Sequence, residues 1–438
     1  MSRLLFIVIL IGAIFAGRSI YRGFVAESLL AWGDDRASRD AALASAPANP
    51  AVIAARAKYI FYRAETPDEE MALAELRRAV RLSPFDYRYW LELGRAAENH
   101  GDAKAAALAL DRARTLAPGY FETHWTWANF KLRNGETEES IAAFHHALLI
   151  SENRPGVTNG RAALNVYDAL AQALGLDPEM LRRVAPADEN AQSYLAYYYA
   201  TRGALDPAME IYRRLTLRRD SARQELMAEL LRCAEAAGRY DVAGEVWNGL
   251  REMAGVREVP GINSGNLIEN GGFERVPLSE EYPQLLGSGL GFDWLMPRHA
   301  EVSVRRDDER PHTGQRALLV SFEMGMTTPF ANLAQVVRVE PGRRYRLSLY
   351  VRTSNVPVEP PSIEITDAKN PDAITHRLGL PREAADWQEQ TLDFTTLAET
   401  RAIRILLRTP VYSDLGRELG SLSRVALHLD DFSLVRID

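Results

Sequence analysis

The sequence predicts a multidomain fold in which an all-α solenoid of helical repeats precedes an all-β sandwich, behind an N-terminal membrane segment. Three observations support this class. The chain opens with an apolar run, a spacing of 34 residues recurs through its Ala- and Leu-rich first part, and apolar residues alternate with a period of two beyond residue 265. Helices and strands bury one face with different periods, so the change of period marks a change of fold.

Composition sets the broad class of protein. The chain has 438 residues, of which 47% are hydrophobic and 25% charged, and its net charge is −7. This length predicts two or three domains with sizeable cores. Arginine and lysine are scattered rather than clustered, which argues against a nucleic-acid partner. A single cysteine, Cys233, allows no internal disulfide or cysteine-rich metal site.

The N-terminal segment, residues 1–23, contains an apolar run from Leu4 to Gly17. The run is shorter than the ~20 residues that span a membrane, but it extends if Arg18 snorkels to the headgroups. We expect an uncleaved single-pass anchor in a bacterial inner membrane. The alternatives are a cleaved signal peptide, which leaves a secreted or periplasmic protein, and a plain buried helix. Ile14 fits a cleavage site at Ala16 poorly.

A 34-residue period organises residues 24–256. Pro50, Pro84 and Pro118 have this spacing, and small and large apolar residues recur with them. The recurring positions around one unit are Trp90, Leu93, Gly94, Gly101, Ala106, Leu110, Ala113 and Pro118. Each unit is expected to be two antiparallel helices, with small residues where backbones approach closely and a proline where the second helix ends.

These positions resemble the tetratricopeptide repeat over roughly residues 27–256. The resemblance implies a groove that holds a protein partner, either a peptide or a helix. The pattern departs in two places. His124 and Trp127 replace the usual residues of the third unit, and residues 153–190 are off period and are expected to hold one irregular helix pair.

Residues 257–265 contain Pro260, Gly261 and Gly265 and are predicted to be a linker. Several runs with alternating apolar residues follow it, separated by turn signals that are typical of a β-sandwich. The runs are residues 301–306, 316–322, 332–339, 345–353, 387–394, 401–409 and 425–437.

Five stretches within residues 266–438 come in a recognisable order: NLIENGGFE, HTGQRALLVS, VEPGRRYRLSLYVRT, WQEQTLDF and LDDFSL. Together they resemble carbohydrate-binding modules of families 4 and 9, which are jelly-roll sandwiches. Galactose-binding-like jelly rolls of other function share the same skeleton. The resemblance makes Asn270 to Phe273 the first turn of the domain, where the glycines permit unusual backbone angles and Phe273 anchors the core.

The resemblance also implies a structural calcium ion. Its carboxylate ligands would be Glu274 with Asp430 or Asp431, and backbone carbonyls near Thr313 and Gln315 would complete the oxygen shell. The alternative is that these carboxylates face water or pair with arginine.

A ligand face is predicted from the alternation within two strands. Tyr350 and Arg352 share the outer face of one strand, and Arg404 and Arg408 share that of another. If both strands belong to one sheet, arginines and an aromatic platform form a surface for an acidic glycan. Phe330 is expected to add an exposed ring from a loop, whereas Trp294 and Trp387 match positions that pack structurally. The alternative is a merely solvated face.

No enzyme is predicted, because the sequence has no phosphate loop, no GxSxG or HExxH motif, and no Cys-His framework. We expect a periplasmic, membrane-anchored adaptor in which the repeats bind a protein and the sandwich binds a polysaccharide, as in assembly or export of a surface exopolysaccharide. Arg18 and Arg22 slightly oppose this orientation. The alternative function is a purely protein-binding scaffold with a structural sandwich.

Overall fold

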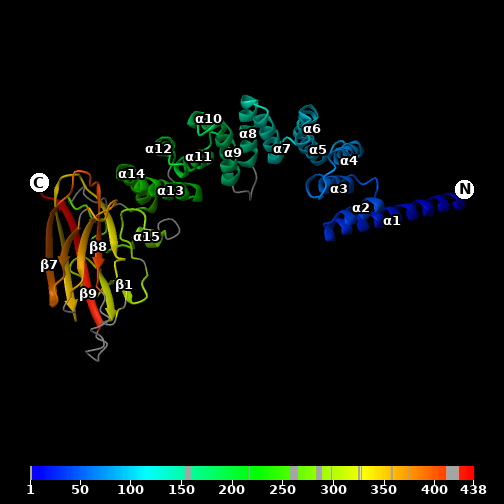
Figure 1. Cartoon of the computed structure of the whole chain (residues 1–438). Coiled ribbons are helices and arrows are strands. Elements are labelled where there is room, and N and C mark those ends of the chain that lie inside the picture. The colour runs from blue at the N-terminus through cyan, green and yellow to red at the C-terminus, as the bar shows by residue number, and fades with distance from the viewer. Residues whose placement is uncertain are drawn as a thin grey trace. The chain divides into compact units, whose positions relative to one another are not determined.

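The structure is a computed structural model, and its elements are labelled in Figure 1. It describes residues 2–152, 159–216, 218–256, 265–282, 289–296, 298–323, 326, 328–356, 359–373, 375–410 and 424–438. The chain divides into two compact units, Met1–Leu195 and Ala196–Asp438, called here the helical unit and the mixed unit.

The helical unit is a succession of helices joined by short turns. Its elements are α1 (Ser2–Trp32), α2 (Arg36–Ser45), α3 (Pro50–Tyr62), α4 (Glu69–Leu82), α5 (Tyr87–Asn99), α6 (Ala103–Leu116), α7 (Phe121–Arg133), α8 (Thr137–Glu152), α9 (Asn159–Leu174) and α10 (Pro178–Val184). Helix α11 (Glu189–Thr201) crosses the boundary to the mixed unit. The off-period stretch 153–190 thus holds α9 and α10, and its residues 153–158 lie outside the described part of the chain.

The 34-residue spacing reappears in the helix boundaries. Helix α7 begins 34 residues after α5, and α8 begins 34 residues after α6. The repeated small residues are buried where helices approach, since a Cβ added to Gly94 would lie 2.5 Å from the Leu110 side chain. Gly101 ends its helix in the left-handed conformation, with φ of 88°. Ala106, Leu110 and Ala113 are fully buried, as the period predicts.

Helix α1 is continuous to Trp32, beyond the predicted segment 1–23. Its stretch Ile7–Trp32 is long and apolar enough to cross a membrane, although an N-terminal signal sequence has the same features. Many of the exposed large apolar side chains of the described residues lie on this helix, including Ile20, Phe24 and Trp32. Water is an unfavourable neighbour for such a surface, which suits a lipid environment.

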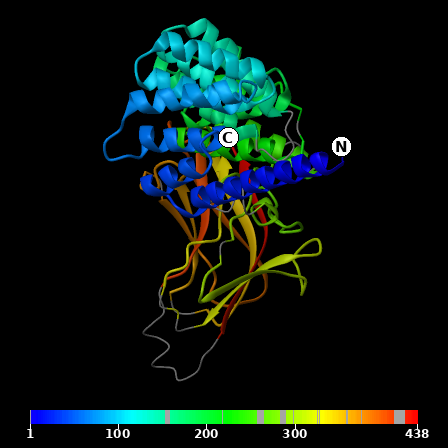
Figure 2. The ribbon, with the colours of Figure 1, turned by 90° about the vertical axis from the view of Figure 1, so that its right-hand side faces the viewer.

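The mixed unit begins with α12 (Leu205–Tyr212), α13 (Ser221–Ala237), α14 (Tyr240–Ala254) and the short α15 (Leu278–Glu281). Its strands are β1 (Val302–Asp307), β2 (Ala317–Glu323), β3 (Ala334–Arg338), β4 (Arg344–Ser354), β5 (Ser362–Asp367), β6 (Thr375–Gly379), β7 (Ala384–Thr395), β8 (Ala402–Arg408) and β9 (Arg424–Arg436). Figure 2 shows the strands, coloured yellow to red, running alongside one another.

The strands form two antiparallel sheets around one core. One sheet has the order β1-β2-β9-β4-β7 and the other β3-β8-β5-β6. Leu347 and Leu349 of the first sheet and Ile403 and Ile405 of the second belong to the same buried cluster. Because both inner faces share this core, the two outer faces point in opposite directions.

The first turn of the sandwich differs from the prediction in detail. Phe273 is fully buried in the core, as expected. The left-handed backbone falls on Asn270 and Phe273, with φ of 53° and 57°, rather than on the glycines. Gly271 is needed for space instead, because an added Cβ would lie 2.2 Å from the carbonyl oxygen of Phe432.

Helices α13 and α14 pack on the outer face of the four-stranded sheet. Arg338 of β3 lies so close to Gly244 of α14 that an added Cβ would be 2.0 Å from its Nη1. Glu235 of α13 accepts a hydrogen bond from the backbone N–H of Gly291 at 2.8 Å. The compact mixed unit therefore includes helices that the sequence assigns to the 24–256 solenoid. Most of the predicted linker, residues 257–264, lies outside the described residues.

Candidate functional site

The predicted ligand face is split between the two sheets. Tyr350 and Arg352 lie on β4 of the five-stranded sheet, whereas Arg404 and Arg408 lie on β8 of the four-stranded sheet. The prediction that they form one surface is therefore wrong. Alternation along a single strand correctly groups residues by face, but it carries no information on which strands become neighbours.

The two β8 arginines have other surroundings. Arg404 stands opposite Val336 of β3, and its charge acts on Glu235 of helix α13. Arg408 donates a hydrogen bond to Glu364 at 2.6 Å, and Arg377 pairs with the same carboxylate. Neither arginine faces the surface that carries Tyr350.

Phe330 is also misplaced by the sequence prediction. Its ring is fully buried within the sandwich core rather than exposed on a loop. The backbone explains this, because Phe330 and Thr409 form an isolated bridge in which the Thr409 N–H donates to the Phe330 carbonyl at 2.9 Å. The bridge fixes the strand-like direction of the segment and turns the ring inward.

A group of partly buried side chains occupies the outer face of the five-stranded sheet. It is called here the sheet-face cluster and consists of His312, Tyr350, Arg352, Trp387 and His428. The His312 and Tyr350 rings are stacked with centroids 3.6 Å apart, and the Arg352 guanidinium lies 5.7 Å from the Trp387 ring centroid. Edge contacts of Trp387 with both histidines connect the group.

The register of the sheet builds this cluster from distant parts of the sequence. Arg352 of β4 pairs with His428 of β9, and β7 carries Trp387 on the other side of β4. The Trp387 indole N–H donates to the carbonyl of Arg310 at 3.0 Å, which fixes the ring at the edge of the group. The rings are thus held in place while part of their surface stays open.

The surroundings of His428 favour its neutral form. Burial, followed by the Arg352 charge, lowers the pKa of His428 below its ordinary value. Arg352 Nη2 lies 3.2 Å from His428 Nδ1, and since a guanidinium can only donate, Nδ1 must be the acceptor. Burial also lowers the pKa of Arg352. The cluster therefore presents one guanidinium beside aromatic rings, which suits a ligand with hydroxyl and carboxylate groups.

The three predicted metal ligands do come together beside this cluster, at the turn that contains Gly314. Glu274 Oε1 accepts hydrogen bonds from the backbone N–H groups of Gln315 at 2.8 Å and Arg316 at 3.2 Å. Only glycine fits the turn, because its φ is 63° and an added Cβ would lie 1.9 Å from Glu274 Oε1.

Asp430 and Asp431 hold the other end of the same turn. Asp430 Oδ2 accepts from the backbone N–H of His312 at 2.8 Å, and Asp431 accepts from the Thr313 hydroxyl at 2.7 Å. Asp431 Oδ2 also lies 2.6 Å from His312 Nδ1. Burial, together with the neighbouring Asp431 charge, raises the pKa of Asp430 to about 6. Glu274, Asp430 and Asp431 are together called the carboxylate cluster.

The donor set of this cluster differs from the calcium site that the resemblance implies. Within the described part of the chain no group of three or more His, Cys, Asp or Glu side chains has the arrangement of a metal site. The turn offers N–H groups to the carboxylates, whereas calcium requires oxygens, including carbonyls of that same turn. Hydrogen bonds alone account for the described contacts of the cluster, and chelation tests the calcium site that the resemblance implies.

Sequence reasoning missed part of the sheet-face cluster. Trp387 was expected to pack structurally, and neither His312 nor His428 was singled out. The period of two does place Trp387 and His428 on the outer faces of their strands, so the signal was present. What the pattern lacked was the strand order, which brings β7 and β9 to either side of β4.

Comparisons with known proteins show likeness at a coarse level. No family model and no curated protein matches the chain. A family 16 carbohydrate-binding module is 19% identical over 39% of this chain and 99% of its own, with a TM-score of 0.26. MamA is 16% identical over 52% of this chain and 97% of its own, with a TM-score of 0.29. A CBM4 structure is 17% identical over 39% and 99%, with a TM-score of 0.25.

Likeness at these identities and TM-scores carries no argument about activity or ligands. The described residues agree with it only in the order of their parts, helices first and antiparallel sheets after them. Any functional conclusion therefore depends on the side chains of this chain.

Proposed function

We propose that this chain is a non-enzymatic adaptor whose sandwich binds a polysaccharide while its helical repeats hold a protein partner. The observation that carries the proposal is the sheet-face cluster, in which stacked rings and a guanidinium share a partly open surface. Sugars pack on aromatic rings through their C–H faces, and arginine recognises carboxylates with paired hydrogen bonds. An acidic polysaccharide satisfies both kinds of group.

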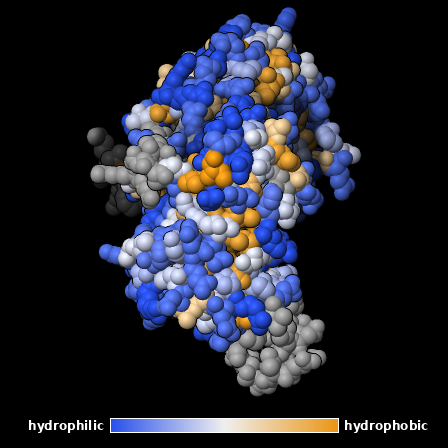
Figure 3. Space-filling model, turned by 90° about the vertical axis from the view of Figure 1, so that its left-hand side faces the viewer, coloured by the Kyte–Doolittle hydropathy of each residue, from blue (hydrophilic) through white to orange (hydrophobic). Residues whose placement is uncertain are grey.

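The surface around the cluster suits such a ligand. Figure 3 shows one face of the whole molecule, on which hydrophilic side chains cover most of the surface. Arg310 lies next to the cluster and pairs with Asp386 at 3.2 Å, with 66% of the Arg310 side chain accessible. We expect weak binding that fades with salt, because exposed charges are screened within about 10 Å at 0.1 M salt.

The rest of the chain supports an envelope role for this adaptor. The 34-residue period favours tetratricopeptide-like repeats with a groove for a peptide or helix, and the β part favours a jelly roll. Helix α1 would anchor the protein in a bacterial inner membrane with its bulk in the periplasm, or serve as a signal that is removed. Assembly or export of a surface polysaccharide would use both binding surfaces.

Two matched arginine variants test the glycan surface. We expect Arg352→Gln to weaken binding of the full chain to an acidic polysaccharide by about tenfold, which corresponds to one charge-assisted hydrogen bond. Arg404→Gln removes the same charge from the opposite face and should leave the affinity unchanged. Titration calorimetry with an acidic and a neutral polysaccharide measures both. Equal losses in the two variants would contradict the assignment of the surface.

The second candidate function, a protein-binding scaffold, is favoured by a different observation. Helices α13 and α14 bury part of the four-stranded sheet, so the sandwich already serves as a packing surface for helices. A chain that binds no acidic or neutral polysaccharide but captures a protein partner through the repeats would support this alternative.

A further inference from the structure

A pocket of about 390 Å³ lies between α14 and the edge of the four-stranded sheet, within the mixed unit. Trp247 and Arg251 of α14 form one wall, and Leu267, Phe292 and Arg338 contribute to the others. The volume is at the lower end of the range for small-molecule sites. The pocket is on the opposite side of the sandwich from the sheet-face cluster.

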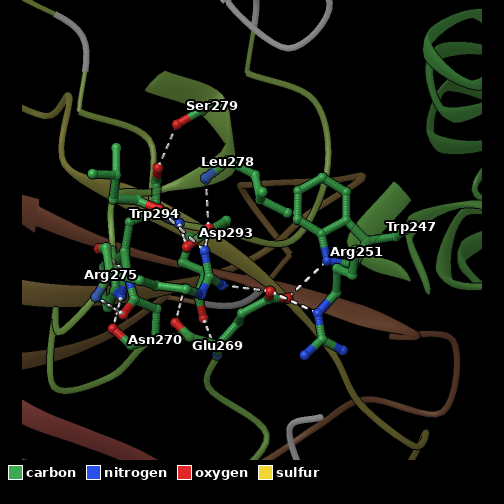
Figure 4. Close-up of polar contacts among 11 residues, drawn as sticks. Trp247, Arg251, Glu269, Asn270, Arg275, Leu278, Ser279, Asp293 and Trp294 are labelled. Atoms are coloured by element: carbon green, nitrogen blue, oxygen red, sulfur yellow. Dashed lines mark hydrogen bonds and ion pairs between the residues drawn. The ribbon is translucent and has the colours of Figure 1, made fainter. Parts of the chain in front are cut away.

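Arg251 is buried at this pocket, and part of its guanidinium group makes no hydrogen bond to the described residues. The residue is only 3% exposed, and its Nε lies 2.9 Å from Glu269 Oε1. Its Nη2 is buried and has no hydrogen-bond partner among the described residues. Figure 4 shows the terminal nitrogens of Arg251 pointing away from Glu269. A buried donor without a partner is costly, so its presence points to a missing acceptor.

Arg338 supplies a second guanidinium at the same pocket. Its guanidinium carbon lies 5.4 Å from the Phe292 ring centroid, and the residue as a whole stays exposed at the pocket. Burial lowers the pKa of Arg338, and the nearby Arg251 charge acts in the same direction while Glu269 opposes it. The absence of a side chain at Gly244 provides the room that this guanidinium occupies.

The carboxylates near the pocket are already engaged. Glu269 is shared between Arg251 and Arg275, and its other oxygen accepts from the Trp247 indole at 2.7 Å (Figure 4). Glu340, which also lines the pocket, pairs with Arg436 at 3.0 Å. The two pocket arginines therefore outnumber the carboxylates available to them.

We propose that this pocket binds a small molecule that carries a carboxylate on a ring or aliphatic body. The carboxylate would lie between Arg251 Nη2 and the Arg338 guanidinium, which offer the donors that carboxylates accept in pairs. The body of the ligand would contact the apolar walls at Leu267 and Phe292. This site is independent of the polysaccharide surface, since the sheet-face cluster contributes nothing to it.

The experiment uses the full chain and titration calorimetry with defined probes. D-glucuronate and N-acetylglutamate represent a sugar acid and an amino-acid-like carboxylate, glucose is the neutral control, and inorganic phosphate tests for an anion without an apolar body. We expect at least one carboxylate to bind and to raise the melting temperature, with an affinity that falls as salt increases, and glucose to do neither. The carboxylate that binds more tightly identifies the class of ligand.

Variants of the pocket separate binding from folding. Arg251→Gln disturbs a buried ion pair and can unfold the protein, so Arg338→Gln is the main variant and should weaken carboxylate binding at least tenfold. Gly244→Ala keeps every charge but displaces the Arg338 guanidinium, and should weaken binding several-fold. Arg382→Gln removes an exposed charge elsewhere in the mixed unit and is the control. Binding of neither carboxylate above glucose, tighter binding of phosphate than of both, or equal losses in Arg338→Gln and Arg382→Gln would overturn the proposal.

Discussion

Arginine and aromatic side chains stand on both outer faces of the sandwich, but among the described residues helices pack against part of the four-stranded sheet, near β3. On that face Arg251, Glu269 and Trp247 form a buried network between α14 and the sandwich. On the five-stranded sheet the Arg352 guanidinium lies 5.7 Å from the Trp387 ring centroid, a cation–π contact in which both side chains are only partly buried. Similar residues thus join two elements in one place and offer a binding surface in the other, and burial makes the difference.

Removal of a buried charge next to α14 should have the largest effect on the stability of the protein. Glu269→Ala leaves both Arg251 and Arg275 without their shared carboxylate in a buried position. We expect the free energy of unfolding to fall by about 3–5 kcal/mol, the usual cost of breaking a buried ion pair. Urea denaturation followed by tryptophan fluorescence measures it.

Asp393→Ala is the matched control for that experiment. Asp393 pairs with Arg346 at 2.7 Å in an exposed position on the open sheet, where solvent screens the charges. We expect little change in the unfolding free energy. Similar losses in the two variants would show that burial does not distinguish the two faces.

The carboxylate cluster should make stability depend on pH. The pKa of Asp430 is raised to about 6 in the fold, so the native state keeps a proton that the unfolded chain releases near pH 4. The unfolding free energy should therefore fall as pH rises from 4 to 6, by about 3 kcal/mol from this group.

Denaturation midpoints between pH 4 and 7 test this dependence. Buried Glu235 has a pKa raised to about 7 and acts in the same direction, so Asp430→Asn should remove only part of the slope. An unchanged slope in Asp430→Asn would show that Asp430 titrates normally.

Chelation is expected to have the smallest effect. The resemblance predicts calcium at Glu274, Asp430 and Asp431, whereas the hydrogen bonds of the turn account for the cluster without a metal ion. We expect the melting temperature of the full chain to be nearly the same in chelator and in calcium. A fall of several degrees in chelator that Glu274→Ala abolishes would establish the calcium site, because a bound ion stabilises only the folded state.

The sequence predicts the order of parts and most of the strands because their periods are local properties. Helix α7 begins where the 34-residue repeat requires, and β4 covers the predicted run 345–353. Strands β5 and β6 were missed. Strand β5 directly follows Pro360 and Pro361, which are signals for a turn. All six of its residues are buried, so it lacks the alternation on which the prediction depends.

The site was less predictable, because it depends on strand order and on helix packing. Residues such as Arg352 and Arg404 have the same local pattern and differ only in the sheet that receives them. The pairing of Arg251 with Glu269 has no local signal at all, since these residues flank the predicted linker. Phe330 shows a further reason why the site was hard to predict. A single backbone bridge decides whether its ring faces solvent or the core.

The central claim is that the open face of the five-stranded sheet binds an acidic polysaccharide. Titration calorimetry of the full chain and of Trp387→Ala against an acidic polysaccharide, at low and high salt, tests it most directly. We predict measurable binding that weakens with salt, and a several-fold loss in Trp387→Ala from the missing ring contact, about 1 kcal/mol. Binding that is absent in the wild type, or equal in the wild type and Trp387→Ala, would contradict the claim.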